Sequence, residues 1–134
     1  MSEGSLWSRV RKALRHLDPV RIENRLEKGT PDVNCVGDIW IELKWQRKAP
    51  KRGGILKLDH DMTLEQRIWA IRRHKAGGKT YVLLKIGPEY LLFKGYIAAE
   101  FLGKLTLEQL KEKALGVWRQ KLNNQELNDL LKKN

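Results

Sequence analysis

The segment from residue 29 to residue 45, GTPDVNCVGDIWIELKW, limits the fold more strictly than any other part of the chain. It contains two short apolar stretches around Gly37-Asp38, and charged residues lie inside both stretches. Side chains alternate between the two faces of a β-strand, so a one-residue change of register moves every side chain to the opposite face. The length of the connecting loop therefore decides which residues meet.

A two-residue loop at Gly37-Asp38 pairs the two strands unfavourably. It would place Val33 opposite Glu42 and Asp32 opposite Leu43, so that apolar and charged side chains mix on both faces. Neither face of such a strand pair would suit a hydrophobic core.

A three-residue loop at 36–38 separates the two kinds of side chain. One face then becomes apolar throughout, because the apolar residues of the two strands oppose one another. This face consists of Val33, Cys35, Ile39, Ile41, Leu43 and Trp45. The other face carries Asp32 opposite Glu42, with Lys44 about 6–7 Å farther along the strand. The hydrophobic pattern thus predicts an odd loop and two adjacent carboxylates.

Two directly opposed carboxylates repel each other unless something neutralises them. Their Cβ atoms would lie about 4.5–5.5 Å apart, and like charges at that separation are destabilising. A divalent cation would reverse the sign, and two or three protein oxygens with waters suit Mg²⁺. The alternative is a salt-bridged surface in which Lys44 neutralises the acids and nothing binds.

The charge balance favours a polyanionic partner. The chain has 27 Lys and Arg against 16 Asp and Glu, a formal net charge of +11 and a pI near 10.0. Nucleic acid is the first candidate and an anionic membrane the second. A basic protein without such a partner is the alternative. Acids on a DNA-binding face would repel phosphate unless a metal intervened.

Length and cysteine content set further limits. At 134 residues and 41% hydrophobic, the chain can form one domain with a real core. Its single cysteine excludes an intrachain disulfide and a cysteine-rich zinc site, and fits a reducing compartment. No apolar stretch approaches the roughly 18 residues of a membrane span, so we expect no membrane partner. The amphipathic SLWSRVRKALRHL is somewhat like a transit peptide, but it leads within a few residues into the segment with the acids.

Hydrophobic periodicity and turn residues predict helices alternating with pairs of strands. Asp18-Pro19 is typical of a helix start and Gly29 of a helix end, which predicts a short helix between them. The expected order is α, β, β, α, β, β, α, which indicates an α/β (α+β) domain with a mixed central sheet flanked by helices. The expected helices are 5–17, 19–28, 63–76, 97–102, 106–121 and 124–132, and the expected strands are 32–36, 39–45, 79–87 and 89–95.

Pro31-Asp32 followed by Glu42-Leu43-Lys44 resembles the motif of the PD-(D/E)XK nuclease superfamily. Glu23, GTPD, IWIELKW, Gln66 and AGGKTYVLL extend the resemblance to the VRR-NUC group and its phage-type stand-alone members, with archaeal Holliday-junction resolvases as a related branch. The resemblance covers about 20–95. It implies a restriction-endonuclease-like core, a single nuclease domain over 1–134 and a C-terminal helical extension at about 97–134.

The resemblance also implies a metal site. Asp32 and Glu42 would bind Mg²⁺, for which Mn²⁺ would substitute, and the backbone carbonyl of Leu43 would add an oxygen. Glu23, expected on a helix, would be the further acid that touches the metal or its water. An ordinary exposed helix acid is the alternative for Glu23.

Lys44 and Gln66 take supporting roles in this resemblance. Lys44 would orient or activate the attacking water and steady charge on the phosphate, and Gln66 would support the site from the next helix. For Gln66 the alternative is purely local, because TLEQ at 63–66 is a capping box. The same four residues recur at 106–109, where no catalytic role is expected.

Phosphate contacts are expected on the basic loop that follows the catalytic strand, and a solvated run of charge is the alternative. A further contact is expected beside Gln66. The candidates are Arg47, Lys48, Lys51, Arg52 and Arg67.

Together these features predict a Mg²⁺-dependent DNA endonuclease that hydrolyses phosphodiester bonds. A chain expected to stand alone, without a recognition domain, is expected to recognise DNA shape. The resemblance favours branched DNA of the Holliday-junction type, a homodimer, and the cytoplasm of a bacterial host if the protein is phage-encoded. Two alternatives remain: a nicking, DNA-degrading or single-strand nuclease without junction preference, and a non-catalytic basic nucleic-acid-binding module.

Overall fold

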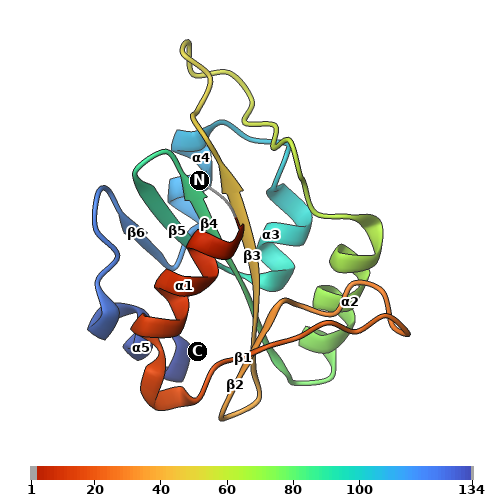
Figure 1. Ribbon diagram of the computed structural model, residues 1–134. Helices are drawn as coiled ribbons and strands as arrows, with labels where there is room; N and C mark the ends of the chain where they lie inside the picture. Colours follow the sequence, from red (N-terminus) through yellow and green to blue (C-terminus); the bar gives the residue numbers. More distant parts are fainter. Residues whose placement is uncertain (1–2, 134) are drawn as a thin grey trace.

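A single mixed sheet of six strands, in the order β1-β2-β3-β4-β5-β6, runs through the centre of the protein (Figure 1). The computed structural model describes residues 3–133. β3 and β4 are parallel, and the other neighbouring pairs are antiparallel. The strands are β1 (Val20–Arg21), β2 (Val33–Cys35), β3 (Ile39–Gln46), β4 (Lys79–Ile86), β5 (Glu89–Lys94) and β6 (Gly116–Trp118).

Helices cover both faces of this sheet and create two hydrophobic cores. α1, the 3-10 helix η1 and α5 pack on one face, while α2, α3 and α4 pack on the other with the loop that contains Leu56 and Leu58. The helices are α1 (Glu3–Ala13), η1 (Arg15–Leu17), α2 (Leu64–Lys75), α3 (Gly95–Phe101), α4 (Leu107–Lys113) and α5 (Asn124–Lys133). No helix within residues 3–133 is long and apolar enough to cross a membrane.

The pairing of β2 with β3 has the register that the hydrophobic pattern predicts. Val33 pairs with Ile41, and Cys35 pairs with Ile39. The connection is therefore the predicted three-residue loop at 36–38, in which Gly37 and Asp38 have positive φ angles of 94° and 58°. The apolar face of the strand pair lies in the core formed with α1 and α5.

Two predicted helices are wrong. Residues 19–28 form the short strand β1 and an irregular loop, because Asp18 ends η1 in the left-handed conformation and does not begin a helix. The helix predicted over 106–121 stops at Lys113. The chain then forms β6, which extends the sheet beside β5 and replaces helical hydrogen bonds with sheet pairing.

The C-terminal helix α5 covers the sheet, as its apolar residues indicate. Leu127 and Leu131 are almost completely buried in the core shared with α1. The Asn128 amide donates to the carbonyl of Ala13 at 2.9 Å, and the Tyr81 hydroxyl donates to the carbonyl of Leu131 at 3.2 Å. The two ends of the described chain are thus joined through the same core.

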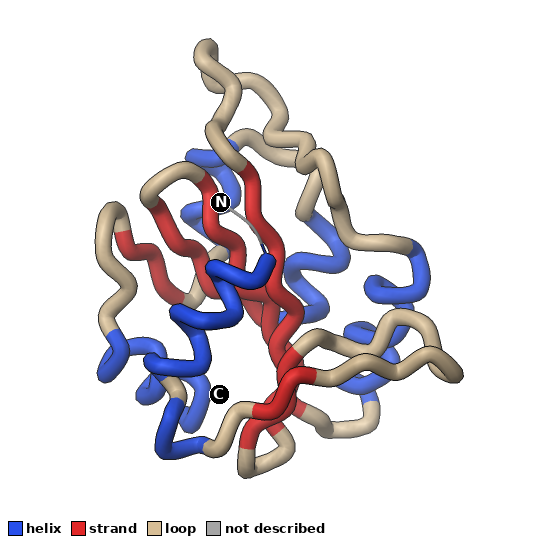
Figure 2. The backbone as a smooth tube through the Cα atoms, viewed as in Figure 1, coloured by secondary structure: helices blue, strands red, loops and turns tan. Residues whose placement is uncertain are grey.

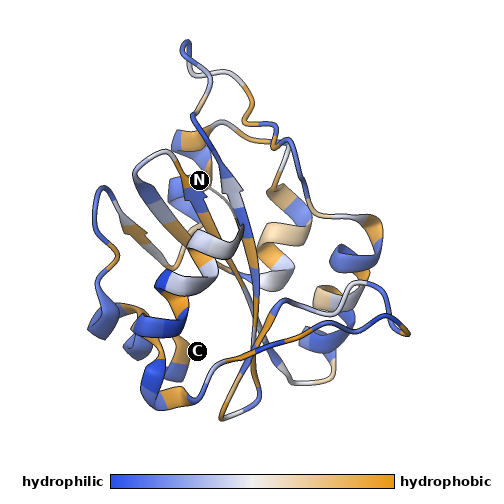
Figure 3. Cartoon of the chain, viewed as in Figure 1, coloured by the Kyte–Doolittle hydropathy of each residue, from blue (hydrophilic) through white to orange (hydrophobic). Residues whose placement is uncertain are grey.

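The connection between β3 and α2 projects beyond the sheet as a long loop (Figures 1 and 2). Its base is anchored, since Leu56 and Leu58 are buried and the Leu56 N–H donates to the carbonyl of Leu105 at 2.9 Å. The tip is exposed and hydrophilic (Figure 3). The loop therefore presents polar residues on a fixed base.

Replacing Gly95 with alanine should lower the free energy of unfolding by about 1–3 kcal/mol, because the site is already filled. A Cβ atom there would lie 2.9 Å from the Thr80 Cβ and 3.3 Å from the Ala70 Cβ, so α3 would have to move from the sheet. Urea denaturation measures the effect. Gly54→Ala is the matched control, because nothing lies within 4 Å of its added Cβ. Equal stability of the two variants would contradict this packing.

Candidate active site

Strand β3 directs Glu42 and Lys44 away from the α1 core and toward α2. Both side chains are buried, with relative exposures of 5% and 7%. Their polar groups pair, with 3.6 Å between the Lys44 Nζ and the Glu42 Oε2. Charged groups are rarely buried to this degree unless they are paired, so this pair is the distinctive polar feature of the sheet.

Gln66 connects the first turn of α2 to Glu42. Its Oε1 accepts the Thr63 backbone N–H at 2.9 Å, which completes the predicted capping box. Its Nε2 donates to the Glu42 Oε2 at 2.8 Å. The capping box is confirmed, and the same side chain reaches the carboxylate of Glu42. The role of Gln66 in an active site stays a prediction.

Asp32 approaches the site just beyond the last residue pair of β2 and β3. Its Oδ2 accepts the backbone N–H of Leu43 at 2.8 Å, while its own carbonyl accepts the N–H of Ile22 at 2.7 Å. These bonds hold its carboxylate beside β3 at the position where β2 separates from it. The predicted proximity to Glu42 is reflected in the pKa of Glu42.

The pKa of Glu42 is raised to about 9 by burial and, second, by the negative charge of Asp32. The positive charge of Lys44 offsets part of this effect. The Glu42 Oε1 is also buried and has no hydrogen-bond partner. A carboxyl group at this position therefore ionises only at a substantial cost, unless a cation joins it.

Lys44 is held by a residue that the sequence did not indicate. Its Nζ donates to the backbone carbonyl of Asp61 at 3.4 Å. The Asp61 side chain in turn accepts the N–H of Met62 at 2.7 Å and pairs with Arg67 at 3.1 Å. Because Lys44 contacts a carbonyl, which every residue type has, no sequence signal could have identified this position.

Gly29 lets the loop before Asp32 lie directly on α2. Its φ angle is +90°, and a Cβ atom would collide with the backbone of Glu65 and lie 2.9 Å from the backbone nitrogen of Gln66. Only glycine combines this conformation with so close an approach. The glycine thus brings the GTPD segment against the helix turn that supplies Gln66.

Glu23 does not lie on a helix, and it is exposed in the loop after β1. Within residues 3–133, no three Asp, Glu, His or Cys side chains form a group that could hold a metal ion. The structure therefore brings Asp32, Glu42, Lys44 and Gln66 together but does not add Glu23 to them. The contribution of the Leu43 carbonyl remains a prediction.

Arg67 is occupied by contacts inside the protein. Its guanidinium donates to the carbonyls of Met62, Ala99 and Leu102 at 3.3, 2.7 and 3.1 Å, besides its ion pair with Asp61. These bonds join the start of α2 to α3. These contacts give Arg67 a structural role, and its phosphate contact stays a prediction.

The other predicted phosphate contacts lie on the projecting loop. All four side chains are exposed, and within residues 3–133 none of their charged groups forms a hydrogen bond or ion pair. They are Arg47, Lys48, Lys51 and Arg52. The first lies three residues beyond Lys44, or about 10 Å along an extended chain.

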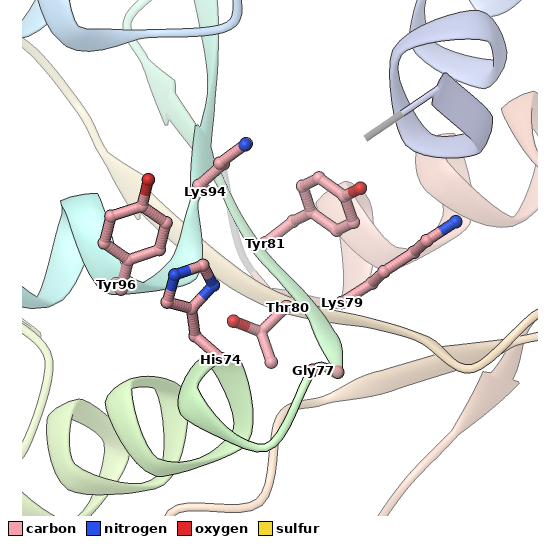
Figure 4. A pocket seen from close by; sticks show the side chains of 8 residues that line it. His74, Gly77, Lys79, Thr80, Tyr81, Lys94 and Tyr96 are labelled. Atoms are coloured by element: carbon pink, nitrogen blue, oxygen red, sulfur yellow. The ribbon is translucent and has the colours of Figure 1, made fainter.

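A cavity of about 200 Å³ lies apart from these residues, at the far end of α2 (Figure 4). The rings of His74 and Tyr96 stack there with 3.9 Å between their centroids. Lys79 extends away from this pair (Figure 4). Since its polar groups do not converge on one point, we assign no role to this cavity.

The sheet order and the two helical layers define a restriction-endonuclease-like fold, in which Glu42 lies on β3 and Asp32 lies just before β2. A solved structure with this fold is that of Hjc, a Holliday junction resolvase from the archaeal hyperthermophile Archaeoglobus fulgidus. The similarity has a TM-score of 0.53 and covers 81% of this chain and 93% of Hjc, at 15% sequence identity. No protein-family model and no curated protein matches the sequence.

The raised pKa of Glu42 predicts a specific dependence of stability on pH in the presence of a chelator. The folded protein keeps the proton up to about pH 9, whereas the unfolded chain loses it near the ordinary value of 4.5. Between these values the folded state binds more protons, so the contribution of Glu42 to stability falls as pH rises, by up to about 1.4 kcal/mol per pH unit.

Glu42→Gln removes this titration and leaves the rest of the protein unchanged. Urea denaturation from pH 5 to pH 9 should therefore show the variant gaining stability relative to the wild type as pH increases. Parallel stability profiles would contradict the assigned pKa.

Proposed function

We propose that this protein is a metal-dependent DNA endonuclease that hydrolyses phosphodiester bonds. The observation that carries the proposal is the buried Glu42 carboxylate, which has one unpartnered oxygen and lies beside Asp32 and Lys44. The restriction-endonuclease-like fold and the net charge of +11 support the same conclusion.

The donors present fit a hard divalent cation. Such ions take carboxylate oxygens and keep several waters, and the Glu42 Oε1 lacks any other partner. Asp32 would provide the second carboxylate, and the Leu43 carbonyl is a candidate third oxygen. We propose Mg²⁺ as the ion and Mn²⁺ as its substitute. When bound, the cation supplies a water of lowered pKa and neutralises charge on the phosphate.

The chain's own residues have separate tasks in this proposal. Lys44, held by Glu42 and the Asp61 carbonyl, orients the attacking water and stabilises negative charge on the phosphate. Gln66 fixes the orientation of the Glu42 carboxylate. Burial around these groups excludes bulk water and strengthens their electrostatic interactions.

The projecting loop is the proposed DNA-binding element. Its four basic side chains, defined above, have no competing acidic partners within residues 3–133, so they are available to phosphates. Backbone contacts of this kind position a nucleic acid without recognising its sequence. The proposed substrate is therefore recognised by its shape.

We further propose branched DNA of the Holliday-junction type as the substrate and a homodimer as the active species. The support is the fold shared with Hjc, together with the sequence resemblance to phage-type VRR-NUC nucleases. Symmetric incision of a junction requires two sites, and we find one in the described part of the chain. The proposed location is the cytoplasm, and it is that of the bacterial host if the protein is phage-encoded.

Incubation with labelled DNA tests the activity. The wild type should cut a four-way junction in Mg²⁺ or Mn²⁺ and not in chelator, and Glu42→Gln and Lys44→Met should each lower the rate by at least about a hundredfold. Equal cutting of junction and linear duplex would reject the junction preference. Failure to cut junction, duplex or single-stranded DNA would reject the enzyme.

A non-catalytic nucleic-acid-binding module is the second candidate, favoured by the salt-bridged state of Lys44 and Glu42. Calorimetric titration of Mn²⁺ distinguishes the two functions. The proposed enzyme binds the ion, and Glu42→Ala abolishes this binding. A non-catalytic module would bind Mn²⁺ neither in the wild type nor in the Glu42→Ala variant.

The two identical TLEQ segments provide an internal control for Gln66. Gln66→Leu and Gln109→Leu each remove one of the two hydrogen bonds of a capping box and leave the threonine bond in place, and the loss of this one bond should cost about 0.5–1.5 kcal/mol of stability. Only Gln66→Leu also removes a hydrogen bond to Glu42, so only this variant should lose DNA cleavage. Equal activity of the two variants at a temperature where both are folded would contradict the role of Gln66.

A further inference from the structure

Helix α2 has an exposed apolar stripe on the side opposite its core-facing residues. Leu64, Ile68 and Ile71 occur at i, i+4 and i+7, with relative exposures of 68%, 51% and 38%. This spacing places them on one side of a helix. The opposite side carries the buried Trp69 and Ala70.

The neighbouring loop extends this apolar surface. Leu26 is completely exposed, and the loop that carries it runs beside α2 (Figure 1). An ion pair of 2.7 Å between Glu27 and Arg72 connects the loop to the helix. The loop is also ordered internally, because the Asn24 side chain accepts the backbone N–H groups of Leu26 and Glu27.

The charges beside the stripe are self-complementary. Glu65 and Arg72 are seven residues apart, so they lie on the same flank of α2, with the acid near the start and the base near the end. If two copies pack with their α2 helices antiparallel about a two-fold axis at Ile68, each Glu65 comes beside Arg72 of the other copy, whose guanidinium would then bridge Glu65 and the Glu27 of its own chain. The same axis brings the two Ile68 side chains together.

We propose that this stripe is the surface on which a second copy of the chain docks. Stable interfaces bury about 800 Å² on each partner, so the loop with Leu26 must join α2 in the contact. The purpose of this dimer rests on the proposed function, whereas the docking itself does not. Because Gln66 lies on the same helix, docking through α2 would fix the separation of two active sites.

The first test is sedimentation velocity over a wide range of protein concentration. The wild type should dimerise, and Ile68→Glu should raise the dimer dissociation constant at least about tenfold, because the substitution places two carboxylates on the two-fold axis. Ile55→Glu is the matched control, since Ile55 is 44% exposed on a different surface. It should leave the dissociation constant unchanged.

The second test exchanges the charges. Glu65→Arg alone and Arg72→Glu alone should each weaken dimerisation, because each places like charges in both symmetry-related pairs. An equimolar mixture of the two variants should restore a dimer, since both pairs in the heterodimer are then oppositely charged. Altered folding of one variant could not produce this recovery.

A wild type that stays monomeric at every concentration overturns the proposal. So does a dimer that Ile68→Glu leaves intact, or a mixture that dimerises no better than its components. DNA cleavage does not enter these measurements, so they can fail or succeed independently of the proposed function.

Discussion

The hydrogen bond between Gln66 and Glu42 connects the sheet to α2, and the organisation of the candidate site depends on it. A buried carboxyl group must be satisfied by its surroundings, and here one oxygen is occupied by an amide and a lysine. The other oxygen has no partner in the protein. The arrangement is therefore rigid on one side of the carboxylate and open to an additional ligand on the other.

Much of the strand pairing could be predicted because side chains alternate between the two faces of a strand with a period of two residues. The apolar residues on either side of 36–38 permit one register only, and the structure has that register. Helix α2 could be predicted equally well from the sequence. Thr63 and Gln66 form a local capping box, and a glycine turn at 77–78 follows the helix. In both cases the information lies within a few residues of the element it determines.

The errors occur where distant parts of the chain decide the conformation. Gly116, Val117 and Trp118 form a strand because β5 provides an edge to pair with, and nothing in the local pattern indicates that edge. The contact from Lys44 to the Asp61 carbonyl could not be predicted from the sequence either, because the acceptor is a backbone group that every residue type has. The bonds from Arg67 to carbonyl groups of α3 and of the loop after it could not be predicted either, because they too join distant parts of the chain through the backbone.

The two TLEQ segments show how little of a residue's role can be contained in its immediate neighbours. Thr63 to Gln66 and Thr106 to Gln109 form the same cap with nearly the same bond lengths, so their local energetics are interchangeable. What differs is the acceptor 2.8 Å beyond one amide nitrogen, supplied by a strand 24 residues away in sequence. A comparison of short segments would rate the two glutamines as equivalent, whereas only their tertiary surroundings distinguish a helix cap from a support for a buried carboxylate.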